Sequence, residues 1–121
     1  MDHRARFAAL LAAERTATLQ RLDGLERDFA GIIEATGASG ADDEHDPEGA
    51  TIAFERQHIA ALASQAREHL AQIDAAMRRL AQGSYGTCES CGQPIPAARL
   101  AARPVTTTCL PCAASVVPGR R

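Results

Sequence analysis

The sequence predicts a mainly α-helical fold, in which a long antiparallel coiled-coil hairpin is followed by a small C-terminal finger built on four cysteines, with a short helix. Two observations carry this prediction. Apolar residues recur at steps of three and four along two long segments, and all four cysteines of the 121-residue chain form two Cys-x-x-Cys pairs near the C-terminus. The predicted organisation is a hairpin over residues 1–82 with an acidic tip loop at 37–46, a finger over 83–114 and a flexible tail over 115–121.

The composition favours a thin helical seam over a bulky core. Hydrophobic residues make up 45% of the chain, but 26 residues are alanine and only 3% are aromatic. Alanine favours helix strongly and buries little area. The formal charge of −2 does not suit a general nucleic-acid binder, so sequence-specific DNA binding is not expected. The chain has no apolar run of about 18 residues and no signal-peptide pattern, which predicts no membrane association and a cytoplasmic location.

The first helix is expected from about residue 3 to residue 36, with Gly37 as its C-cap. Its apolar seam consists of Leu11, Thr18, Leu22, Leu25, Phe29 and Ile32. The loop that follows is rich in glycine and acidic residues and ends in a helix-start signal. Asp46 can cap the free backbone N–H groups of the next helix, and Pro47 suits its first position.

The second helix is expected from about residue 47 to residue 82, where Gly83 closes it. Its seam consists of Ile52, Ile59, Leu62, Ala66, Leu70, Ile73, Met77 and Leu80. Each helix has roughly 34 residues and is therefore ~50 Å long. Since neither helix can bury its seam alone, the two should fold back on each other as an antiparallel hairpin.

The cysteines Cys88, Cys91, Cys109 and Cys112 have the spacing of a structural zinc site, with seventeen residues between the two pairs. Four thiolates at ~2.3 Å complete a tetrahedral Zn²⁺ and leave no open position, so one zinc per chain should stabilise the fold without catalysis. Gly92 can supply a positive φ in the first turn, and Pro111 can stiffen the second. A redox dithiol pair or an iron–sulfur cluster would also use these cysteines.

Two arginines are expected to support the finger. Four thiolates and one Zn²⁺ carry a charge of −2, and Arg99 and Arg103 are well placed in the sequence to offset it. The stretch between the cysteine pairs is bounded by prolines, and it should form a short helix that covers the metal-binding turns.

The segment "GSYGTCESCGQPIPAARLAARPVTTTCLPCA" resembles the zinc finger of the DksA/TraR family of RNA polymerase-binding transcription factors. The shared features are Tyr-Gly-x-Cys-x-x-Cys-Gly, Ile-Pro, Arg-Leu-x-Ala-x-Pro and the final Cys-x-x-Cys. The hairpin ahead of the finger resembles the coiled coil of the longer, DksA-like members. The resemblance implies a bacterial transcription regulator that is not an enzyme and whose hairpin tip enters the secondary channel of RNA polymerase.

The tip and the ligand residues of that family are only partly present. The family tip motif is Asp-x-x-Asp-x-Ala, and the nearest match is Asp43, Asp46 and Glu48, with Glu48 where alanine stands in the family. A register that starts at Asp46 instead puts Gly49 at the second Asp position and Thr51 at the alanine, so the register stays open. Members that bind the alarmone ppGpp use an arginine, matched by Arg103, and two lysines. The lysine positions are Gln72 and Ala113, so binding of ppGpp is not expected, because phosphates need positive charge.

Two alternatives to a DksA-like regulator remain open on the sequence. Acidic groups at a hairpin tip could bring a second Mg²⁺ to the polymerase site and promote transcript cleavage, as the Gre factors do. The chain could also be an interaction or scaffold protein that shares only the zinc finger and does not act on RNA polymerase.

Overall fold

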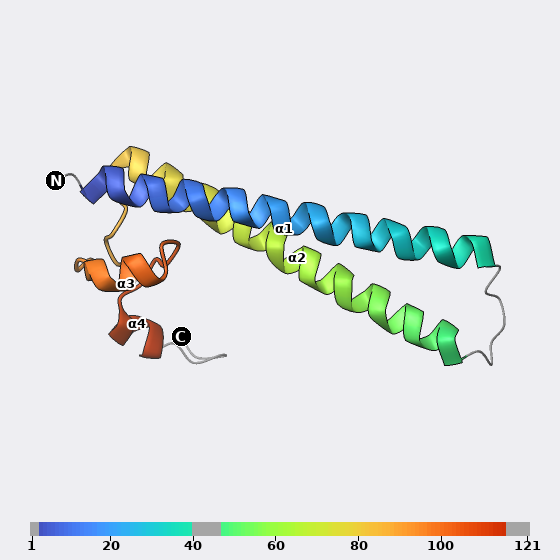
Figure 1. Cartoon of the computed structure of the whole chain (residues 1–121). Helices are drawn as coiled ribbons and strands as arrows, with labels where there is room; N and C mark the ends of the chain where they lie inside the picture. Colours follow the sequence, from blue (N-terminus) through green and yellow to red (C-terminus); the bar gives the residue numbers. More distant parts are fainter. Residues whose placement is uncertain (1–2, 40–46, 116–121) are drawn as a thin grey trace. The chain divides into compact units, whose positions relative to one another are not determined.

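The structure, a computed structural model, describes residues 3–39 and 47–115 (Figure 1). In order along the chain, the helices of this part are α1 (His3–Ser39), α2 (Pro47–Gln82), α3 (Ala97–Ala102) and α4 (Leu110–Ser115). The described residues contain no strand, and an isolated bridge joins Thr87 to Pro94. The predicted mainly helical fold is confirmed. None of the described helices has an apolar stretch long enough to cross a lipid bilayer.

The chain divides into two compact units. One consists of residues 1–15 with 71–121, and the other of residues 16–70. The finger thus forms one compact unit with both ends of the hairpin helices that lie next to it in the sequence or the fold, residues 1–15 and 71–82, whereas the sequence had placed a boundary after Gln82. The reason is that the first turns of α1 and the last turns of α2 share a core with the finger, as described below.

Helices α1 and α2 pair antiparallel in both units. In the first unit, Arg15 Nε donates to Asp74 Oδ1 at 2.9 Å. In the second, Arg67 Nη2 donates to Glu26 Oε2 at 3.1 Å. As the residue number rises along α1, the number of its partner on α2 falls, which is the mark of an antiparallel pair. The predicted helical hairpin is therefore confirmed.

The ends of α2 match the prediction. Gly83 follows its last residue with φ 86°, a conformation that glycine adopts without strain. The N–H of Ser84 donates to the carbonyl of Arg79 at 2.9 Å, which ties down a free carbonyl at the end of the helix.

The predicted end of α1 is wrong. The helix continues through Gly37 to Ser39, because a single glycine costs a helix only about 1 kcal/mol and neighbouring residues can outweigh it. Residues 37–39 of the expected tip loop are thus helical, and the rest of that loop, including Asp46, the expected N-cap of α2, lies outside the described residues. Helix α4 also includes Ser115, where the tail was expected to begin.

Four residues of the predicted seam of α1 and α2 are buried and most of the others are half-buried, with one error. Leu11 and Ile73 are completely buried, whereas Leu62 is 36% exposed. Ala63, which is 5% exposed, takes the seam position beside it. Ile59, Ala63, Ala66, Leu70 and Ile73 follow in alternating steps of four and three, the spacing of a coiled-coil seam, and Leu62 falls at its edge.

Placing a charge in the seam should destabilise the protein according to how deeply the residue is buried. Ile73→Asp should lower the free energy of unfolding by at least ~2 kcal/mol, because it leaves an unpaired carboxylate in a fully buried position. Leu62→Asp is the matched control on the same helix and should cost clearly less. Denaturant titrations followed by helical circular dichroism measure both, and equal losses would mean that the seam is wrongly assigned.

Candidate metal centre

The first cysteine pair lies in a tight turn closed by backbone hydrogen bonds. The N–H of Gly92 donates to the carbonyl of Cys88 at 2.9 Å, and the N–H of Cys88 donates to the carbonyl of Gln93 at 2.8 Å. Gly92 has φ 78°, so the positive φ expected from the sequence is confirmed. The turn directs the side chains of Cys88 and Cys91 toward the same side.

The second cysteine pair lies at the start of α4. The carbonyl of Cys109 accepts the N–H of Ala113 at 3.0 Å, and Pro111 falls in the first turn, where its missing N–H costs nothing. A backbone hydrogen bond of 2.9 Å from Glu89 to Thr107 joins the two cysteine segments. The segments therefore meet through the backbone as well as through the sulfurs.

The four cysteine sulfurs converge on a single point. Those of Cys88, Cys91, Cys109 and Cys112 all lie within 4.8 Å of one another. The sulfurs of Cys91 and Cys109 are 3.8 Å apart, which matches the separation of about 3.8 Å between two sulfurs of a tetrahedral zinc with ~2.3 Å bonds. The arrangement fits a structural Zn²⁺ with all four positions filled by thiolates.

The electrostatics of the metal-free cluster also call for a cation. Hydrogen bonds, above all from the backbone N–H of Cys109, lower the pKa of Cys88 to about 6. The pKa of Cys112 rises to about 12, chiefly because its side chain hydrogen-bonds the sulfur of Cys109. The pKa of Cys91 is raised as well, so without a metal Cys91 and Cys112 keep their protons at neutral pH. Zinc binding must therefore displace protons, and acid must weaken it.

Arg99 anchors the segment that leads into the second cysteine pair. Its Nε donates to the carbonyl of Thr108 at 2.9 Å, and its Nη2 lies 3.1 Å from the hydroxyl of Thr106. That hydroxyl itself donates to Thr108 O at 3.1 Å. Arg103 is exposed, and its backbone N–H bonds the carbonyl of Arg99. For both arginines, a role in offsetting the thiolate charge stays a prediction.

A cavity of about 630 Å³ lies beside the finger. It is lined by three arginines, Arg79, Arg99 and Arg103, and by Gln72 and Ala113. The Nη2 of Arg79 is buried and has no hydrogen-bond partner in the described part of the chain. Arg103, Gln72 and Ala113, the three positions that the family resemblance connects with ppGpp, thus line one cavity. Gln72 and Ala113 are neutral, but the three arginines still carry positive charge there.

The side chains of the predicted tip residues lie outside what the structure describes. Asp43 and Asp46 lie outside the described residues. Glu48 is in the first turn of α2, but its side chain is not described. Their role stays a prediction.

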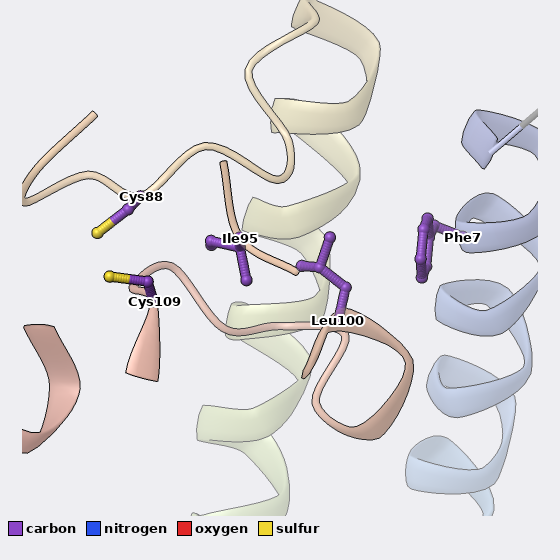
Figure 2. Close-up of a cluster of buried hydrophobic side chains, with 5 residues drawn as sticks. All are labelled: Phe7, Cys88, Ile95, Leu100 and Cys109. Atoms are coloured by element: carbon purple, nitrogen blue, oxygen red, sulfur yellow. The ribbon is translucent and has the colours of Figure 1, made fainter. Parts of the chain in front are cut away.

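The sequence did not reveal the core beneath the cysteines. Phe7, Ile95 and Leu100 form a buried cluster with Cys88 and Cys109 (Figure 2). Phe7 stands four residues before Leu11, so continuing the seam by one step would have shown that it is buried. No local pattern could have shown that it packs against the finger.

The fold and the site together define a class of protein: a helical hairpin that carries a closed, four-thiolate structural zinc finger. Residues 83–117 match the prokaryotic dksA/traR C4-type zinc finger. Residues 83–117 are therefore a finger of the dksA/traR C4 type, and its four cysteines carry one structural zinc.

Two curated relatives share sequence with the chain. It is 39% identical to the uncharacterized protein YteA of Bacillus subtilis over 86 residues, which are 71% of this chain and 36% of that protein. It is 54% identical over 41 residues to the RNA polymerase-binding transcription factor DksA of Caulobacter vibrioides, covering 34% of this chain and 29% of that one. The chain thus spans only about a third of the length of these relatives.

A solved structure resembles nearly the whole chain. The transcription factor DksA2 from Pseudomonas aeruginosa superposes with a TM-score of 0.78 at 27% sequence identity. The likeness covers 92% of this chain and 80% of DksA2, so it includes both the hairpin and the finger.

Protein purified without chelator should contain close to one zinc per chain, because the four sulfurs fill its coordination sphere. Elemental analysis measures this number, and visible absorption would reveal iron. Replacing Cys109 with Ser removes one ligand and should release most of the zinc to a moderate chelator. An iron chromophore, or a finger that stays folded without metal, would contradict the assignment.

Arg99→Ala should weaken the finger more than Arg103→Ala does. The first change removes the hydrogen bonds to the Thr106–Thr108 segment and should cost about 1.5–3 kcal/mol, the usual range for bonds to a charged group. The second affects an exposed side chain and should stay within about 0.5 kcal/mol. Denaturant-induced zinc release to a chromophoric chelator compares them, and equal effects would rule out the anchoring role.

Proposed function

We propose that the protein is a DksA-like transcription regulator that binds RNA polymerase in the secondary channel through its hairpin tip. The likeness to transcription factor DksA2 across 92% of the chain is the observation that supports this most strongly. A protein that shared only the zinc finger would not resemble DksA2 along the hairpin as well. The RNA polymerase-binding DksA of Caulobacter vibrioides, which shares the finger, supports the same partner.

The charge distribution of the chain suits this proposal. The unit formed by residues 16–70 has eleven acidic residues and four arginines, whereas the unit with the finger has nine arginines and four acidic residues. An acidic hairpin end can face basic groups and bound cations near a polymerase active site. The protein itself performs no chemistry in this proposal, reads no DNA sequence and acts in the cytoplasm, where its partner is.

We expect this activity to be independent of ppGpp. Gln72 and Ala113 supply no charge at the two positions where ppGpp-binding relatives have lysine. The arginines of the cavity remain, but a ligand with several phosphates would meet fewer cations there.

The hairpin tip can be tested without disturbing the fold. Changing Asp43→Asn together with Asp46→Asn removes two carboxylates, while Asn at residue 46 still caps a helix. The double variant should lose its effect on transcription initiation in a reconstituted assay. Its zinc content, helicity and binding to polymerase should persist, since the finger and the hairpin flanks would supply most of the contact area.

The matched control for the tip is Asp42→Asn, a neighbouring carboxylate outside the motif, which should be nearly silent. If the double variant regulates as well as the parent, the tip carries no function. Failure of the parent to co-purify with RNA polymerase would favour a scaffold protein instead. Cleavage of the transcript in a backtracked complex would favour a Gre-like factor.

A further inference from the structure

We propose that Phe7, in the second turn of α1, is a positioning residue of the zinc site. In this proposal, zinc binding and the docking of the first turns of α1 onto the finger stabilise each other. The inference concerns the metal centre and does not depend on polymerase binding. All the groups involved lie in the unit formed by residues 1–15 and 71–121.

The contacts run from the metal ligands to α1 through a continuous apolar cluster. Figure 2 shows Ile95 next to the sulfur-bearing side chains of Cys88 and Cys109, Leu100 beyond it, and the ring of Phe7 facing Leu100. Phe7 is 3% exposed, and Ile95 and Leu100 are each 5% exposed. A side chain eighty-one residues before Cys88 thus completes the core of the finger.

The finger side of this cluster is fixed by the same turns that bring the cysteines together. The N–H of Ile95 donates to the carbonyl of Gly86 at 2.7 Å, and Gly86 lies directly against Leu100. Tyr85 packs against Phe7, with ring centroids 5.5 Å apart, and its hydroxyl donates to the carbonyl of Pro104 at 2.9 Å. Moving the cysteine segments apart would therefore displace the surface on which Phe7 packs.

The finger has too few large apolar side chains to bury them by itself. Ile95 and Leu100 are its large aliphatic side chains that are buried, whereas Leu110 is 63% exposed. Leu10, Tyr85 and Ala101 also pack against this cluster, but Phe7 is its buried aromatic side chain, and without its ring part of the cover over Ile95 and Leu100 would be lost. Thermodynamic linkage makes the coupling reciprocal: if bound zinc favours the docking of α1 by some factor, docking raises the zinc affinity by the same factor. Such couplings usually amount to about 5- to 150-fold.

The test is the zinc affinity of the full chain, measured by competition with a chromophoric chelator. Phe7→Ala should lower the affinity by about 5- to 150-fold, and Phe7→Leu should restore most of it. Phe54→Ala is the matched control, because Phe54 is 75% exposed on α2 and should leave the affinity unchanged. An unchanged zinc affinity in Phe7→Ala would overturn the proposal.

A second variant separates this contact from general loss of stability. Leu11 is fully buried in a neighbouring cluster with Ile73 and Ala76, which contacts the finger through Tyr85 and Val105 but contains no cysteine. Leu11→Ala should therefore weaken helix pairing but lower zinc affinity less than Phe7→Ala does. An equal loss of zinc affinity in Leu11→Ala would show that Phe7 has no particular role.

The reciprocal effect has its own readout. Amide hydrogen exchange of residues 4–12 should speed up several-fold when a chelator strips zinc from the parent protein. In Phe7→Ala, the same amides should exchange at rates that do not depend on zinc. Equal rates in the parent with and without zinc would exclude the coupling.

Discussion

The mutual repulsion of four thiolates is the constraint on which residues 83–115 depend. The sulfurs of Cys88, Cys91, Cys109 and Cys112 lie within 4.8 Å of one another, a distance at which four negative charges persist only around a cation. Short turns and a backbone bond between the cysteine segments hold this geometry. A segment of this size buries little apolar area, so metal binding, worth ~10–16 kcal/mol in comparable small fingers, takes the place of a large core.

The hairpin meets a different constraint, because alanine occupies several of its most deeply buried positions. Ala63, Ala66 and Ala76 are buried where a coiled coil usually has leucine or isoleucine. Small side chains bury little area per residue, and the exposed pairs Arg15–Asp74 and Arg67–Glu26 contribute little at a surface. The helix propensity of alanine therefore adds to the stability that the larger buried side chains, such as Leu11 and Ile73, give the hairpin.

The features that the sequence predicted correctly are those with a local physical cause. The bounds of α2 follow from a proline at its start and Gly83 after its end. The convergence of the sulfurs follows from pair spacing, and the positive φ of Gly92 follows from the tight turn it closes. In each case, a few neighbouring residues determine the geometry by themselves.

The errors and omissions have their causes elsewhere in the chain. Gly37 was expected to end α1, but a glycine only weakens a helix, and the residues around it decide whether it continues. Leu62 was assigned to the seam because it lies three residues after Ile59 and four before Ala66, but Ala63 fits the same interval and is the residue that is buried. The contact of Phe7 with the finger joins the two ends of the sequence, so no sequence window contains both partners.

The position of Tyr85 gives the molecule a natural optical reporter. The chain has one tyrosine and no tryptophan, so its near-ultraviolet fluorescence comes from this single ring. The ring packs on Phe7, its hydroxyl donates to Pro104 O, and burial raises its pKa above the ordinary value while the guanidinium of Arg79 offsets part of that rise. Its emission, quantum yield and phenolate absorbance thus report on the junction between α2 and the finger without any attached label.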